Sequence, residues 1–189
     1  MARVAAGRRE DLAEFDELFQ GIEASGNVVP NSMLTMGRNP ALLQAYAPLN
    51  AVIYGSGVVS ADLKRLVAHV ASRAAGCQYC AAHNGLRASN LGVEEQKIEA
   101  IWDFESSPLF SAAERSALQL ARAAGQIPNE ATQAHFDELR RHFDDAGILE
   151  LVAVIAMTGF TNRWNDTLRT EFEEAPLAFA TAHLAAHGT

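Results

Sequence analysis

The sequence is poor in basic residues. Its 189 residues contain 15 Lys and Arg against 23 Asp and Glu, which gives a formal net charge of −8. Nucleic acids and anionic membrane surfaces are usually bound by clustered Lys and Arg, whereas the arginines here are scattered among acidic residues. We therefore expect neither a nucleic acid nor a membrane surface as a partner.

Long apolar segments are also absent. The longest run, LVAVIAMTGF from Leu151, is shorter than the roughly 20 residues that span a bilayer. The opening residues, MARVAAGRREDLAEF, are followed by no apolar stretch of the kind, about 7–15 residues long, that secretory signals contain. We expect a cytoplasmic protein. A structural disulfide would not persist in that reducing compartment.

Regular strand patterns are missing as well. No segment of useful length alternates apolar and polar residues, while helical spacing runs through most of the chain. With 49% apolar residues, a chain of this length can bury one core without disulfides. We predict a single all-α domain over residues 1–189, a helical bundle of about seven or eight helices with its core at about 28–170 and short flexible ends.

Prolines, glycines and capping residues predict where several helices begin and end. One helix runs from about Pro40 to a break at Gly55, and Ser60 is a suitable N-cap for the next. Another begins with a capping box at Ser111 and ends at Gly125. The last long segment, AGILELVAVIAMTGFTNRWNDTLRTEF, is apolar nearly all round in its first half, which predicts the central buried helix.

Both cysteines of the chain, Cys77 and Cys80, lie in the stretch AAGCQYCAAHNG. Gly76 is expected to end one helix and Cys77 to begin the next, where free backbone N–H groups and the helix dipole lower a thiol pKa. Cys80 lies one turn further, within reach of Cys77 for a disulfide, and His83 lies one turn beyond on the same side. A neutral His83 could accept the thiol proton of Cys80 or pass a proton to a leaving oxygen.

Two other interpretations of this stretch stay open beside a redox pair. Free cysteines are commonly buried, so both thiols could simply be core residues. Alternatively, Cys77, Cys80, His83 and His69 could form a Cys₂His₂ zinc site. Their spacing matches none of the common zinc-finger patterns, and ligands at successive three-residue steps along one helix converge poorly on one ion.

A wider resemblance surrounds the cysteines. The run LKRLVAHVASRAAGCQYCAAHNGLRASNLG, with the downstream segments FSAAERSALQLARAAGQIP and LELVAVIAMTGFTNRWNDTL, resembles the carboxymuconolactone decarboxylase family and its alkylhydroperoxidase D-like (AhpD-like), peroxidase-related branch. The similarity covers most of the chain, from about VVPNSMLTMGRNPALL to NRWNDTL. It implies an all-α, typically oligomeric protein without a cofactor, so we expect a homo-oligomer with no bound metal.

The resemblance also implies a thiol peroxidase. In such proteins the second cysteine attacks a hydroperoxide, the first closes a disulfide, a histidine after the motif moves protons, and an external dithiol restores the thiols. These roles fall on Cys80, Cys77 and His83. Helix-terminus electrostatics alone would make Cys77 the more acidic thiol; we follow the family and predict that Cys80 attacks first.

Two positions depart from the family pattern. The histidine usually follows the second cysteine by four residues, whereas His83 follows Cys80 by three, and Arg65 stands where the family has a glutamate. His69 lies on the same helical stripe as Arg65, one turn nearer Cys77. We predict that His69 replaces the glutamate as proton acceptor; the alternative is a histidine that only packs.

The predicted function is therefore a cytoplasmic thiol peroxidase that uses a hydroperoxide and an external dithiol reductant. The alternative enzyme is the lactone decarboxylase that gives the family its name, although those members generally lack the cysteine pair. The non-enzymatic alternative is a helical redox sensor or zinc clamp.

Overall fold

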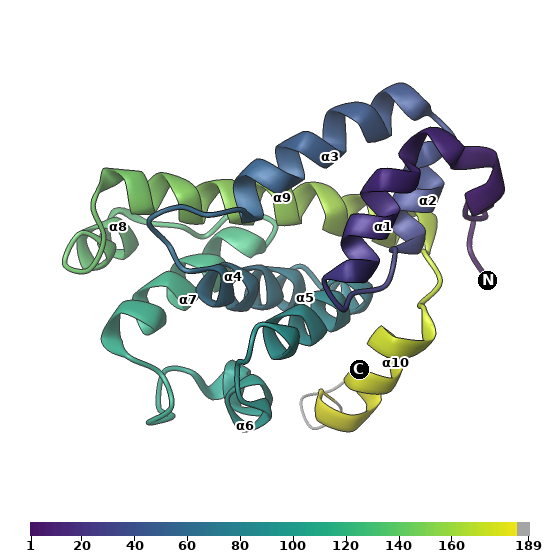
Figure 1. The fold of residues 1–189 in the computed structure, drawn as a ribbon. Helices are drawn as coiled ribbons and strands as arrows, with labels where there is room; N and C mark the ends of the chain where they lie inside the picture. The colour runs from purple at the N-terminus through teal and green to yellow at the C-terminus, as the bar shows by residue number, and fades with distance from the viewer. Residues whose placement is uncertain (185–189) are drawn as a thin grey trace.

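The computed structural model describes residues 1–184 and is helical throughout, with no strand in that range (Figure 1). Residues 185–189, the end of the predicted flexible C-terminal segment, lie outside the described residues. The helices are η1 (Arg9–Phe15), α1 (Asp16–Ala24), α2 (Asn31–Gly37), α3 (Pro40–Tyr54), α4 (Ala61–Ala74), α5 (Gln78–Asn90), α6 (Glu95–Glu99), η2 (Ala100–Asp103), α7 (Ala112–Gly125), α8 (Gln133–Leu139), α9 (Asp145–Leu168) and α10 (Glu174–His183).

The all-α prediction is confirmed, and several helix boundaries agree with their sequence signals. Helix α3 begins at Pro40, Ser111 and Glu114 form the expected capping box of α7, and α7 ends at Gly125. Ser60 is the N-cap of α4, but its side chain makes no capping hydrogen bond. Ten α-helices within residues 1–184 exceed the predicted seven or eight, because short helices contain too few turns to show a periodic pattern.

Helix α4 is the centre of the molecule. It packs against α5, α7 and α9, and its apolar residues Leu66, Val67 and Val70 are almost completely buried. The apolar stripe predicted from its spacing is therefore the contact surface that joins the other three helices. Because α4 leads directly into the cysteine segment, this packing fixes where α5 begins.

The prediction that the last long segment is the central buried helix is wrong. Helix α9 packs against α3, α4, α5 and α7, but Leu149, Val152 and Phe160 are exposed. A helix that is apolar all round can be buried or can keep one apolar face open, and composition does not distinguish the two. The expected self-association stays a prediction.

Helix α9 is also the one helix in residues 1–184 that is long and apolar enough, with a mean hydropathy of 1.2, to match a membrane span by length and composition. Core helices of globular proteins can have the same length and composition, and 44% of the apolar 18-residue stretch of α9 is buried against the rest of the chain.

The buried core extends beyond residues 28–170. Leu12, Phe15 and Phe19 pack with Met36 and Leu43 in a second apolar cluster beside the main one. At the other end, Phe179 of α10 joins the main cluster, and α10 lies against α5. The segments before and after the main bundle therefore close around the helix that carries the cysteines.

The close approach of α7 to α4 generates a stability prediction. A Cβ atom on Gly125 would lie 2.8 Å from the carbonyl oxygen of Ala71 and 2.9 Å from its Cα. We expect Gly125→Ala to lower the free energy of unfolding by about 1–3 kcal/mol, measured by urea denaturation, because the two backbones must separate. The matched control is Gly159→Ala in α9, where the new Cβ has no neighbour within 4 Å; this variant should be as stable as the parent or up to about 1 kcal/mol more stable. Equal stability of the two variants would contradict the interpretation.

Candidate functional site

The two cysteines lie where α4 turns into α5. Gly76 has a φ of +79°, a conformation that residues with a Cβ rarely adopt, and it lets the chain reverse within a few residues. Cys77 is the N-cap of α5, and its Sγ accepts a hydrogen bond from the backbone N–H of Cys80 at 3.4 Å. Both cysteines are free thiols. Their spacing on the first turn of α5 keeps each within reach of the other.

The electrostatics of Cys77 differ from the sequence-based expectation. The thiol is 1% exposed, and its hydrogen bond with Cys80 together with burial raises the pKa of Cys77 far above its ordinary value. The prediction that the helix terminus lowers this pKa is therefore wrong, because the hydrogen bond with Cys80 and the loss of water around a buried thiolate outweigh the favourable helix dipole. Cys77 stays a thiol and can donate its hydrogen toward Cys80.

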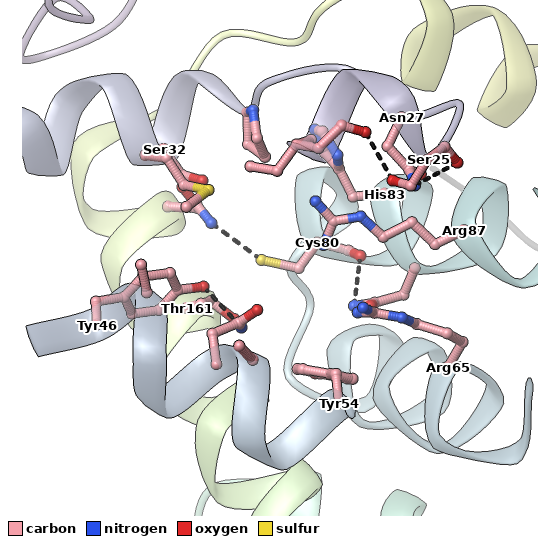
Figure 2. Close-up of a pocket in the computed structure, with 18 of the residues that line it drawn as sticks. Ser25, Asn27, Ser32, Tyr46, Tyr54, Arg65, Cys80, His83, Arg87 and Thr161 are labelled. Carbon is pink, nitrogen blue, oxygen red and sulfur yellow. Dashed lines mark hydrogen bonds between the residues drawn. The ribbon is translucent and has the colours of Figure 1, made fainter. Parts of the chain in front are cut away.

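Cys80, but not Cys77, is among the described residues that line a pocket of about 220 Å³ (Figure 2). The side-chain amide of Asn165, from α9, donates a hydrogen bond to Cys80 Sγ at 3.2 Å. The pocket is formed mainly by α1, α3, α5 and the start of α2, with Arg65 from α4. Its lining residues are Leu18, Ile22, Ser25, Asn27, Pro30, Ser32, Met33, Tyr46, Ala47, Asn50, Ala51, Tyr54, Arg65, Tyr79, Cys80, His83, Asn84, Arg87, Thr161 and Asn165.

His83 lines the same pocket and is held by a carboxylate from the far end of the chain. Its Nε2 lies 2.6 Å from Oε2 of Glu173, in the segment between α9 and α10. The other carboxylate oxygen of Glu173 accepts hydrogen bonds from the hydroxyl of Tyr79, at 2.8 Å, and from the backbone N–H of Asn31. Sequence reasoning missed Glu173, because it is 90 residues from His83 and no local spacing connects the two.

The charges in this pair can be assigned from their surroundings. Burial raises the pKa of Glu173, but hydrogen bonds from His83, Asn31 and Tyr79 outweigh burial and hold it below its ordinary value. Burial lowers the pKa of His83 below 6.5, and Glu173 offsets only part of that effect. At pH 7, Glu173 is therefore ionised and His83 neutral. A neutral His83 that donates from Nε2 has Nδ1 free to accept a proton.

His69 and Arg65 are separated by the fold. His69 is 0% exposed, its Nδ1 lies 2.8 Å from the carbonyl oxygen of Ala81, and it is not among the described residues that line the pocket. Arg65 does line it, with its guanidinium 3.8 Å from the centre of the Tyr54 ring. The shared stripe predicted for the two residues does not bring both to the thiols, because α5 packs over the position of His69.

The Cys₂His₂ set considered for zinc is not assembled. No group of three or more His, Cys, Asp or Glu side chains in residues 1–184 is arranged to hold a metal ion. The Nε2 atom of His83 already pairs with Glu173, and the Nδ1 atom of His69 faces Ala81. These hydrogen bonds direct the two imidazoles to different partners.

Comparison with known proteins places this geometry in context. Residues 40–123 match the sequence model of the Carboxymuconolactone decarboxylase family. The debrominase Bmp8 is 35% identical to this chain. The two structures superpose over 94% of this chain and 96% of Bmp8, with a TM-score of 0.88. A cysteine-to-alanine variant of Bmp8 in complex with 2,3,4-tribromopyrrole gives a TM-score of 0.89 with the same identity, over 95% of this chain and 96% of that one.

Two further relatives are more distant. The protein YnjA of Escherichia coli K12 is 32% identical over 92 residues, which are 49% of this chain and half the length of YnjA. A peroxidase-related protein of Ralstonia eutropha JMP134, described as an alkylhydroperoxidase AhpD core, covers 95% of each chain with a TM-score of 0.83 and 18% identity. This last similarity shows the fold alone.

The surroundings of His83 predict opposite effects of two substitutions on its pKa. The Glu173 carboxylate raises the pKa of His83, whereas the Arg87 charge lowers it. We expect Glu173→Gln to shift the pKa further down and Arg87→Met to shift it up, both measured by an NMR titration of the His83 ring. The sign follows because a carboxylate favours the imidazolium and a guanidinium opposes it. Shifts in the same direction would show that one of the two charges does not act on the ring as described.

Proposed function

Because this chain belongs to the carboxymuconolactone decarboxylase family and carries a thiol pair beside a pocket, we propose that it is a dithiol oxidoreductase. Cys80 takes an electrophilic atom from the substrate, Cys77 closes a disulfide, and an external dithiol in a reducing compartment restores both thiols. The primary candidate substrate is a hydroperoxide.

One observation carries this proposal: of the two thiols, only Cys80 lines the pocket, while Cys77 lies behind it at the first turn of α5. A nucleophile must touch the substrate, and the thiol that resolves the product needs only to reach the nucleophile. Asn165 donates a hydrogen bond to Cys80 Sγ, and such a bond stabilises a thiolate. The protonated Cys77 adds a second donor.

The peroxide reaction balances within this site. Cys80 thiolate attacks the terminal oxygen of the hydroperoxide, the O–O bond breaks, and the electron pair leaves with the alkoxide, which takes a proton. The sulfur of Cys77 then attacks the sulfenic acid of Cys80, forms the disulfide and releases water. Thiol–disulfide exchange with an external dithiol returns both cysteines to thiols.

Proton transfer in this proposal belongs to His83, positioned by Glu173. Neutral His83 accepts the thiol proton as Cys80 becomes a thiolate and returns it to the leaving oxygen, while Glu173 fixes the tautomer and stabilises the transient imidazolium. His69 has no such role here, because its Nδ1 is held at Ala81 inside the core. His83 keeps its proton-accepting form at pH 7 and loses it as the pH falls through its depressed pKa.

A second candidate reaction is reductive debromination. It is favoured by the 35% identity with the debrominase Bmp8 across nearly the whole chain. The electron flow parallels the peroxide reaction: Cys80 thiolate attacks bromine, the C–Br electron pair stays on carbon and takes a proton, and Cys77 displaces bromide as the disulfide forms. Each turnover consumes two thiols and yields one C–H bond and one bromide.

The disulfide cycle gives the main test of the proposed function. One equivalent of hydrogen peroxide should convert both thiols of the parent protein into a Cys77–Cys80 disulfide, located by mass spectrometry of proteolytic fragments. Cys77→Ser should stop with one oxygen on Cys80, and Cys80→Ser should react far more slowly. His83→Ala should slow oxidation of Cys80 by about 10²–10⁴-fold, the range of general acid–base groups. Two free thiols that survive excess peroxide would overturn peroxidase chemistry and leave the debromination candidate, a sensor or a lyase.

The debromination candidate has its own readout. Reduced protein mixed with 2,3,4-tribromopyrrole should release one bromide for each disulfide formed, measured by ion chromatography and thiol titration on the same sample. Cys80→Ser is the control and should release none. A protein that reacts with hydrogen peroxide but releases no bromide would keep the first candidate and exclude the second for this compound.

A further inference from the structure

We propose that the pocket beside Cys80 selects an organic anion built on a flat ring, whose negative group is bound by Arg65 and Arg87 while its reducible atom meets the thiol. This inference rests on the proposed function, because it names the substrate class of the same site. It starts from an imbalance of charge inside the pocket.

Arg65 and Arg87 give the pocket its positive charge. Both reach inward from the same side, near Cys80 (Figure 2). None of the described residues that line the pocket is Asp or Glu, although the whole chain carries a net charge of −8. The acidic surface of the protein and the positive interior of its pocket therefore differ in sign.

Within residues 1–184, no carboxylate forms an ion pair with either of these two arginines. Arg65 stacks on the Tyr54 ring and donates a long hydrogen bond, 3.4 Å, to Oδ1 of Asn84. Arg87 makes no side-chain hydrogen bond or ion pair with any of residues 1–184. The carboxylate of Glu173 lies close to His83, but it is already hydrogen-bonded to His83, Tyr79 and Asn31. Arg87 therefore has all its donors available for a ligand.

The positive charge persists at neutral pH. Burial and the neighbouring Arg87 lower the pKa of Arg65 to about 10, so its guanidinium stays protonated at pH 7. Two like charges held together in a partly desolvated space repel each other, and an anion between them removes that repulsion. Guanidinium groups also match carboxylate and other oxyanion geometries with paired hydrogen bonds.

The rest of the lining fits a ring. Tyr46, Tyr54 and Tyr79 supply three aromatic side chains, and Leu18 and Met33 add apolar surface. Aromatic and apolar walls with a few polar anchors are typical of sites for small organic molecules. A carboxylate on a ring, a phenolate or a deprotonated halogenated heterocycle has the required combination of charge and shape.

An isosteric pair of thiol reagents tests the charge preference directly. Iodoacetate is an anion and iodoacetamide is neutral, and both alkylate a thiolate by displacing iodide. The measured quantity is the ratio of their rate constants at Cys80 in the reduced protein, with the site identified by mass spectrometry. Arg65→Met and Arg87→Met should each lower this ratio by about tenfold, as expected for one nearby charge at an effective dielectric constant near 20.

Matched variants separate the pocket charge from general effects. Arg140→Met removes an exposed arginine that pairs with Asp137 and should leave the ratio unchanged. Arg65→Lys and Arg87→Lys should retain most of the ratio, because they keep the positive charge. A ratio insensitive to both Met variants, or lowered equally by Arg140→Met, would overturn the inference.

A second pair of compounds, benzoate and benzamide, tests whether the pocket prefers an anion built on a ring. Benzoate and benzamide are compared at the same concentration, one that saturates with benzoate. Benzoate should reduce the rate of Cys80 alkylation by iodoacetamide more than ten times as strongly as benzamide, and Arg87→Met should abolish that difference. Equal protection by benzoate and benzamide would overturn selection of a ring anion. These measurements use only the reduced protein. A peroxide-driven disulfide without anion preference therefore refutes this inference alone, whereas anion preference without a disulfide refutes only the proposed function.

Discussion

The carboxylate of Glu173 is the interaction on which the arrangement of the cysteine pocket depends. It joins three parts of the chain: α5 through His83 and Tyr79, the start of α2 through the backbone of Asn31, and the segment that enters α10. Hydrogen bonds to a carboxylate are stronger than those between neutral groups. Because this carboxylate accepts several of them in a buried place, it holds the histidine tautomer, the tyrosine beside the thiols and one wall of the pocket at the same time.

Structural features that depend on a few neighbouring residues could be predicted from the sequence, whereas contacts between distant segments could not. The start of α3, the capping box at Ser111 and the positions of Cys77 and Cys80 on α5 follow from local signals. Glu173 and Asn165 reach the site from elsewhere in the chain. The helix-terminus rule gave the wrong direction for the pKa of Cys77, because the rule describes dipoles and includes neither the hydrogen bond with Cys80 nor burial.

Helical periodicity also could not predict the different surroundings of two residues on one side of α4. Arg65 and His69 share a stripe of α4, yet Arg65 enters the pocket while His69 packs under α5. In the proposed cycle, the carboxylate that positions His83 is Glu173, which comes from beyond α9. Hydroperoxides and brominated rings are both electrophiles that a thiolate can reduce, so one thiol pair suits both candidate reactions.

The burial of Cys77 has a consequence for turnover as a whole. Cys77 is buried in a small cluster with Cys80, Tyr79 and Phe172, and the described pocket that meets this thiol pair does so at Cys80. In the proposed cycle, an oxidant and a reductant would have to use this one entrance in turn. Such an enzyme follows double-displacement kinetics with parallel lines in a reciprocal plot. Each reactant at high concentration inhibits the half-reaction of the other, so the rate is greatest at a balance of the two.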